Sequence, residues 1–132
     1  YQVPFYCHTY REAAVKTGAR GLHLPLPVFR ETGRQGLAPE IVLGCSVHSI
    51  QEAREAEALG ADYVIAGHIY ATDCKKGLPP RGLEFLEETC RSVSLPVYAI
   101  GGIRLEWEQI EKTLAAGAMG VCVMSGAMTC EY

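Results

Sequence analysis

The sequence predicts an α/β fold in which parallel strands alternate with helices. Six short apolar runs alternate with amphipathic segments along the 132 residues. Three helix-to-strand junctions, at residues 18–22, 60–64 and 117–121, each begin with Gly-Ala and lead into a strand. Repeated βα units of this kind are typical of a parallel sheet. Two folds satisfy the pattern, namely the last six units of a (β/α)8 barrel and an open doubly wound sheet.

The strands are expected in short runs bounded by Gly, Pro or polar residues, and the helices where apolar residues recur every three or four positions. Ser49 and Glu52 form a capping-box pattern at one helix start. The prolines and glycines of residues 25–36 indicate a loop, with a short helical turn between them left open. The last helix is expected to bury Trp107, Ile110 and Leu114. The expected strands are 3–7, 21–24, 41–47, 62–66, 95–100 and 120–124, and the expected helices are 11–17, 49–59, 82–93 and 105–116.

Composition limits the class of protein. A chain of 132 residues suffices for a single domain, residues 1–132, with a modest core. The net charge is −3 and the chain has no basic block, so nucleic acid is not an expected partner. The apolar runs are much shorter than a membrane span and no segment resembles a signal peptide, so no membrane partner is expected.

The cysteine and acidic residues indicate which metal sites and which redox compartment the chain can have. The chain has no Asn and only two Asp, Asp62 and Asp73. Because hard cations prefer carboxylate oxygens, a Mg²⁺ centre has few candidate ligands in this chain. The chain starts at Tyr1 within an expected strand, which indicates a fragment. Six cysteines form no C-x-x-C pair and most lie in apolar runs, which is typical of buried thiols in the cytoplasm: Cys7, Cys45, Cys74, Cys90, Cys122 and Cys130.

A candidate site follows the fourth expected strand. His68 comes directly after this strand, and a polar loop with Thr72, Cys74 and Lys75 follows. Ligands of α/β proteins bind at the carboxyl ends of the strands, and an imidazole can accept and return a proton near neutral pH. Lys75 can neutralise an anionic group, and Thr72 can donate a hydrogen bond. The alternative is a structural histidine followed by a solvated loop.

Two small-residue loops follow the next strands. Gly101 and Gly102 follow the fifth expected strand, and Ser125 and Gly126 follow the sixth. Glycines let backbone N–H groups approach an anion, and in a (β/α)8 barrel the loops after the last two strands are the usual phosphate site. The alternative is that both loops are only tight turns. We favour phosphate binding, because two such loops end neighbouring strands.

Several segments resemble the thiamine phosphate synthase superfamily: G-L-H-L (21–24), G-C-S-V-H-S (44–49), G-A-D-Y-V-I-A-G-H-I-Y-A-T-D-C-K-K-G (60–77), P-V-Y-A-I-G-G-I (96–103) and G-V-C-V-M-S-G (120–126). The resemblance covers most of the chain. It implies a TIM (β/α)8 barrel, of which this chain holds about the last six βα units and lacks the first two.

The superfamily includes a synthase and a tautomerase, and the motifs favour the second. The synthase joins a pyrimidine pyrophosphate to a thiazole phosphate with Mg²⁺, and its acidic metal positions are absent here at residues 7–10 and 23–26. The loop at 67–77, with His68 where the synthase has Pro, is similar to the TenI branch. The resemblance therefore predicts an isomerase, a thiazole tautomerase of thiamine biosynthesis that aromatises a thiazole carboxylate phosphate.

The tautomerase prediction implies a role for each site residue. His68 is expected to be the acid/base, with no cofactor. Lys75 and Thr72 are expected near the thiazole or its carboxylate, and Cys74 is expected among the substrate-binding residues. The residues expected around the phosphate are Gly101, Gly102, Met124, Ser125 and Gly126.

Two alternatives to the tautomerase stay open. One is the Mg²⁺-dependent synthase, and the other is a non-catalytic protein that binds or senses thiazole phosphate. In each case the partner is a phosphorylated thiazole. Six units of an eight-stranded barrel leave two strand edges unpaired, so we also expect a homo-oligomer.

Overall fold

The computed structural model describes residues 2–129, in which six parallel strands form one sheet in sequence order. The strands are β1 (Tyr6–His8), β2 (Gly21–Pro25), β3 (Val42–Val47), β4 (Tyr63–Ala66), β5 (Val97–Ile100) and β6 (Gly120–Cys122). The helices are α1 (Arg11–Thr17), α2 (Leu26–Thr32), α3 (Ile50–Ala58), α4 (Gly82–Ser92), α5 (Trp107–Ala115) and α6 (Ser125–Met128), with a 3₁₀ turn, η1 (Asp73–Lys75).

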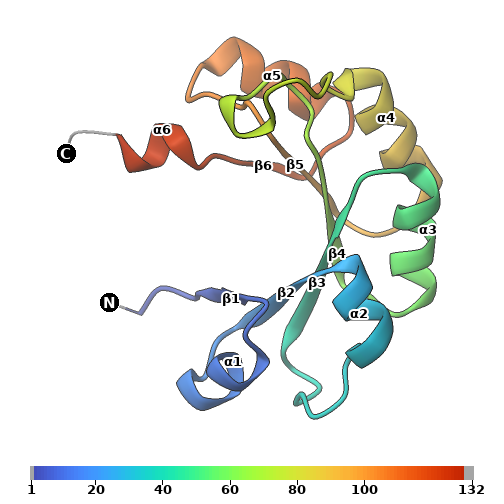
Figure 1. Ribbon diagram of the computed structural model, residues 1–132, viewed down its shortest axis with the longest axis vertical. Helices are drawn as coiled ribbons and strands as arrows, with labels where there is room; N and C mark the ends of the chain where they lie inside the picture. The colour runs from blue at the N-terminus through green and yellow to red at the C-terminus, as the bar shows by residue number, and fades with distance from the viewer. Residues whose placement is uncertain (1, 130–132) are drawn as a thin grey trace.

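The sheet is curled and carries its long helices on the outer face (Figure 1). Each strand pairs in parallel with the next one along the chain, and β1 and β6 are the two edges. A doubly wound sheet reverses its strand order and has helices on both faces. The structure is therefore a parallel half-barrel, and the open doubly wound alternative is excluded.

The hydrophobic core lies between the outer face of the sheet and the helices. Alternate strand residues such as Leu22, Leu43 and Val64 point into this layer, as the period of two in a strand requires. Small residues on the helices, including Ala53 and Ala56, let α3 approach the sheet closely. The inner face carries the other residues of each strand and includes His23, Ser46, Tyr63 and Tyr98.

The local signals at the junctions are confirmed. Gly18, Gly60 and Gly117 all have positive φ, between 66° and 103°, at the ends of α1, α3 and α5. Only glycine adopts this conformation without strain. At the start of α3 the Ser49 hydroxyl accepts a hydrogen bond from the Glu52 N–H (3.1 Å), and the Glu52 carboxylate accepts one from the His48 N–H (2.6 Å).

Two local predictions were wrong. Helix α2 occupies the middle of a segment predicted as loop, because Pro27 is tolerated in a first helical turn and Leu26 and Phe29 are buried against the sheet. In α5, Trp107 is 70% exposed and the buried residue is Thr113. Leu114, which was also expected to be buried, is 39% exposed.

Two further observations concern the burial of the cysteine thiols and the possibility of a membrane-spanning helix. Cys45 is fully buried, and burial raises the pKa of its thiol to about 12. Cys74 is exposed, as its polar surroundings indicate, while Cys130 lies outside the described residues. Within residues 2–129 no helix combines the length and the apolar character needed to cross a membrane.

Candidate functional site

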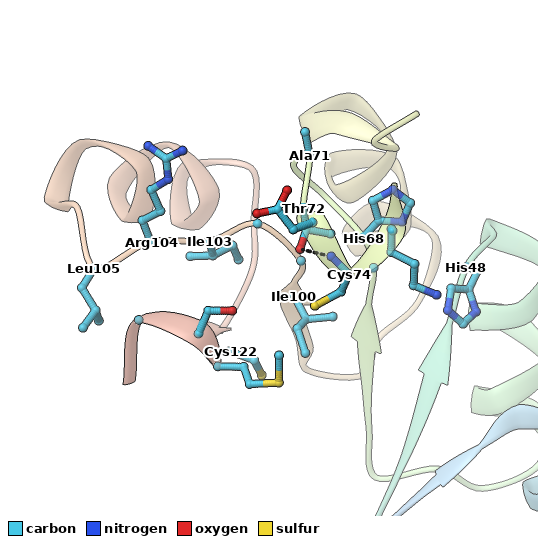
Figure 2. A pocket seen from close by; sticks show the side chains of 18 residues that line it. His48, His68, Ala71, Thr72, Cys74, Ile100, Ile103, Arg104, Leu105 and Cys122 are labelled. Carbon is cyan, nitrogen blue, oxygen red and sulfur yellow. Dashed lines mark hydrogen bonds between the residues drawn. The ribbon is translucent and has the colours of Figure 1, made fainter. Parts of the chain in front are cut away.

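The carboxyl ends of β4, β5 and β6 surround a cavity of about 650 Å³. This volume is in the range of small-molecule sites. All nine predicted site residues line it: His68, Thr72, Cys74, Lys75, Gly101, Gly102, Met124, Ser125 and Gly126. Figure 2 shows His48 and His68 on one side, Arg104 and Leu105 on the opposite side, and Ile100 and Cys122 below. Residues from three separate loops are thus brought together.

His68 is held in place through its backbone. Its carbonyl oxygen accepts a hydrogen bond from the Arg81 N–H (3.0 Å), and the next residue, Ile69, donates to the Ile100 carbonyl (2.9 Å). The side chain is only 8% exposed, and its Nε2 has no hydrogen-bond partner among the described residues. A buried polar atom without a partner is uncommon in native proteins, which favours a functional role for His68.

The glycines of the second loop pack directly against the first loop. Gly101 and Gly102 have φ of 103° and 66°, which favours glycine. A Cβ on Gly101 would collide with the His68 side chain, and one on Gly102 would collide with the Ala71 carbonyl oxygen. The Tyr70 N–H also donates to the Gly101 carbonyl (2.9 Å). The glycines therefore allow two backbones to approach, beside any role toward a ligand.

Thr72 has a structural contact within its own loop. Its hydroxyl accepts a hydrogen bond from the Cys74 N–H (3.4 Å), and its carbonyl accepts one from the Lys75 N–H (3.1 Å). These bonds begin η1, which turns Asp73, Cys74 and Lys75 along the wall of the cavity (Figure 2). The first bond is long, so Thr72 can exchange it for a ligand at small cost.

Sequence reasoning missed several cavity residues. Arg104 follows the Gly-Gly pair by two positions, and His48 follows β3, so the rule that ligands bind at carboxyl ends of strands would have included both. Ile100 and Cys122 had no such signal, because each reads as an ordinary strand residue. Burial raises the pKa of the Cys122 thiol.

The charges around the cavity suit an anion rather than a hard cation. The residues that line the cavity include two with cationic side chains, Lys75 and Arg104, and one carboxylate, Asp73. Arg104 also pairs with Glu106 (3.5 Å) on the exposed side, an interaction worth little in solvent. Residues 2–129 contain no cluster of three His, Cys, Asp or Glu side chains that could hold a metal ion. The residues present therefore do not fit Mg²⁺, which prefers several carboxylate or phosphate oxygens.

A second polar cluster lies deeper on the inner face of the sheet. His23 is 6% exposed, and its two nitrogens contact the Tyr63 hydroxyl (3.1 Å) and the Ser46 hydroxyl (2.7 Å). The His8 ring lies 5.4 Å from the His23 ring. Burial, and to a lesser degree the proximity of His8, lowers the pKa of His23 to about 4. His23 is thus a neutral histidine with a partner on each ring nitrogen, whereas His68 Nε2 has none among the described residues.

The sequence and the fold of this chain are similar to those of known proteins. A family model described as thiamine monophosphate synthase matches residues 1–127. The thiamine-phosphate synthase of Pyrococcus horikoshii is 37% identical over 99% of this chain and 62% of its own length. That of Chlorobium phaeovibrioides is 41% identical over 86% of this chain and 54% of its own length. The structure of a thiamine phosphate pyrophosphorylase from Pyrococcus furiosus has a TM-score of 0.79 at 34% identity, with 98% of this chain and 61% of that one covered.

The comparisons correct the predicted reaction. The prediction of a thiazole tautomerase, an isomerase, is wrong, because relatives that are 33–41% identical over most of this chain are named thiamine-phosphate synthase, a transferase. The prediction gave most weight to the sequence of one loop, around His68, and to the absence of the synthase's acidic metal positions near β1 and β2. The similarity to the synthases instead extends through all six βα units.

Proposed function

Because the chain belongs to the thiamine monophosphate synthase family, we propose that it takes part in forming thiamine phosphate, by coupling a phosphorylated thiazole to a pyrimidine diphosphate. The observation that carries the proposal is the cavity at the ends of β4–β6, where two glycine-containing loops meet Lys75 and Arg104. The chain spans about three fifths of the length of the Pyrococcus proteins it matches.

The loops at 101–102 and 124–126 are proposed to hold the thiazole phosphate. Gly101, Gly102 and Gly126 line the cavity with backbone and no side chain, and Ser125 adds a hydroxyl donor. Met124 supplies an apolar wall beside them. The phosphate would thereby be bound mainly by neutral donors, with the cations adding attraction around it.

The loop at 67–76 is proposed to face the reacting part of the ligand. The coupling expels diphosphate, so positive charge near the leaving group lowers the barrier. Lys75 and Arg104 can supply that charge. His68 Nε2, which lacks a partner among the described residues, can hydrogen-bond the substrate and orient it. Thr72 and Cys74 line the wall next to it.

The wider architecture is also a proposal. We place the chain as a single domain that forms six units of an eight-unit TIM barrel, in line with the half-barrel and with the greater length of the relatives. The unpaired edges of β1 and β6, seen within residues 2–129, support self-association into a homo-oligomer. The loop at 67–77 still resembles the TenI branch in sequence, and we propose that this likeness is confined to the loop and leaves the coupling reaction as the activity.

The test is a coupling assay on the purified protein. The pyrimidine diphosphate and the thiazole phosphate are supplied with and without Mg²⁺, and both thiamine phosphate and released diphosphate are measured. We expect product with the wild type and at least a tenfold lower kcat/KM for Lys75→Met. Lys76→Met is the matched control, because Lys76 adjoins Lys75 but does not line the cavity. Equal losses in both variants would remove the assigned role of Lys75.

A second candidate is a protein that binds thiazole phosphate without catalysis. It is favoured by the poor fit of the described residues to a metal. Tight binding of the thiazole phosphate, measured by calorimetry, without product at any Mg²⁺ concentration would support this candidate and overturn the transferase.

A further inference from the structure

Two loops form most of the cavity wall, and one glutamine contacts the back of one of them. We call residues 67–76 the histidine loop and residues 101–105 the glycine loop. Gln109, in the first turn of α5, is half-buried behind the glycine loop. Its side-chain Nε2 donates to the Gly102 carbonyl (3.1 Å), and its Oε1 accepts from the Arg104 N–H (2.7 Å). One side chain therefore binds the glycine loop at two points.

The same helix also binds the histidine loop. Thr113 is one turn after Gln109 and is fully buried. Its hydroxyl donates to the Gln109 carbonyl (2.7 Å) and lies 3.0 Å from the Tyr70 hydroxyl. The chain of contacts from Tyr70 through Thr113 to Gln109 joins the histidine loop to the glycine loop behind the cavity. Buried polar networks of this kind rigidify what they connect when every member is satisfied.

The glycine loop needs such a restraint because of its composition. Gly101 and Gly102 can rotate more freely than other residues, since neither has a Cβ. If the Gly102 carbonyl turned toward the cavity, its oxygen would repel a bound anion. The hydrogen bond from Gln109 holds this oxygen toward α5, on the side away from the cavity. The bond from the Arg104 N–H likewise fixes the point at which the Arg104 side chain leaves the backbone.

We propose that Gln109 is a positioning residue that holds the glycine loop in the conformation able to bind a phosphate. The inference rests on the proposed phosphate site of the same cavity, and it adds a residue that does not itself line the cavity. Because Gln109 acts through the glycine loop, its removal weakens recognition of the phosphate group and leaves contacts with the rest of the ligand in place.

The experiment compares one ligand with and without its phosphate. Dissociation constants for the thiazole phosphate and for the same thiazole lacking phosphate are measured by calorimetry. Gln109→Met keeps the shape and removes both hydrogen bonds, and Gln109→Glu keeps only the acceptor for Arg104 N–H. Each variant is expected to bind the phosphorylated thiazole about tenfold more weakly, with little change for the other ligand. Gln51→Met, at an exposed glutamine in the first turn of α3, is the control and is expected to match the wild type.

The outcomes separate the inference from the proposed site. Wild-type preference for the phosphorylated ligand that persists in Gln109→Met overturns the role of Gln109 and leaves the phosphate site standing. Equal weakening for both ligands assigns Gln109 a general structural role and also overturns the inference. A wild type without preference for the phosphorylated ligand overturns the phosphate site and the inference together.

Discussion

Two buried histidines illustrate how the surroundings of a residue decide its role. His23 has a hydroxyl partner on each ring nitrogen, whereas the buried Nε2 of His68, a residue that lines the cavity, has no partner among the described residues. His23 lies in the middle of β2, and His68 follows β4 and Gly67. An imidazole with both nitrogens satisfied stabilises the fold, while one with a free nitrogen can contact a ligand.

The low pKa of His23 predicts a loss of stability in acid. Its pKa is about 4 in the folded protein against 6.5 for an ordinary histidine. The unfolded chain therefore takes up the proton first, and the free energy of unfolding falls as pH decreases from about 6.5 to 4, by about 3 kcal/mol in all. Urea unfolding at pH 7, 5.5 and 4.5 measures this loss.

Substitution separates His23 from other acid-sensitive groups. His23→Gln removes the titrating ring and should flatten the pH dependence over this interval. His48→Gln, at an exposed histidine, should retain the slope of the wild type. If His23→Gln and the wild type lose stability in parallel, the pH dependence arises elsewhere.

In the connection between β5 and α5, both the backbone conformation and the packing against another loop require a glycine at position 102. Gly102 and Gly77 both have positive φ, 66° and 81°. A Cβ on Gly102 would collide with the Ala71 carbonyl, whereas a Cβ on Gly77 would meet no atom within 4 Å. The two glycines share the conformational requirement and differ in packing.

Alanine substitution at these two glycines is expected to separate conformation from packing. Both variants incur the penalty of a left-handed residue with a Cβ, about 1 kcal/mol. Gly102→Ala should lose a further 1–3 kcal/mol, roughly, because the histidine and glycine loops must move apart. Thermal and urea unfolding give the difference, and calorimetry with the thiazole phosphate should show weaker binding for Gly102→Ala alone. Equal destabilisation of both variants would mean that the loops adjust without cost.

At the scale of the molecule, the sheet edges are the exposed feature. Within the described residues β1 and β6 each pair on one side, and their outer sides lie in the same opening of the half-barrel (Figure 1). Large apolar side chains are exposed beside both edges, including Phe5 and Met119. Unpaired strand edges with exposed apolar residues promote pairing with other chains.

We expect the 132-residue chain to self-associate in solution. Sedimentation velocity over a concentration series measures the association. Phe5→Lys, beside the β1 edge, should shift the equilibrium toward monomer. Leu59→Lys is the matched control, because Leu59 has the same exposure of 46% but lies at the end of α3. A wild type that stays monomeric at all concentrations, or equal shifts in both variants, would contradict edge pairing.

Much of the site was predictable because the rule behind it is topological. Once strands and helices alternate, the carboxyl ends of the strands must meet at one edge of the sheet, and this brought His68 and the two small-residue loops around one cavity. Gln109 was not predictable, since its contacts with Gly102 and Arg104 depend on how the helix sits behind the loop. Trp107 was misplaced for a related reason, because amphipathic periodicity does not say whether a neighbouring element covers the apolar side.

The alternation of six strands with helices, the glycine helix ends and the position of candidate residues after the strands could all be predicted from the amino-acid sequence. These features depend on local backbone preferences and on side-chain periodicity, which neighbouring residues decide. The three-dimensional structure was needed to show that the sheet curls into a half-barrel, that both ring nitrogens of His23 have partners while His68 Nε2 has none, and that Gln109 binds the glycine loop. Each of these depends on contacts between residues far apart in the chain, whose partners are chosen by packing.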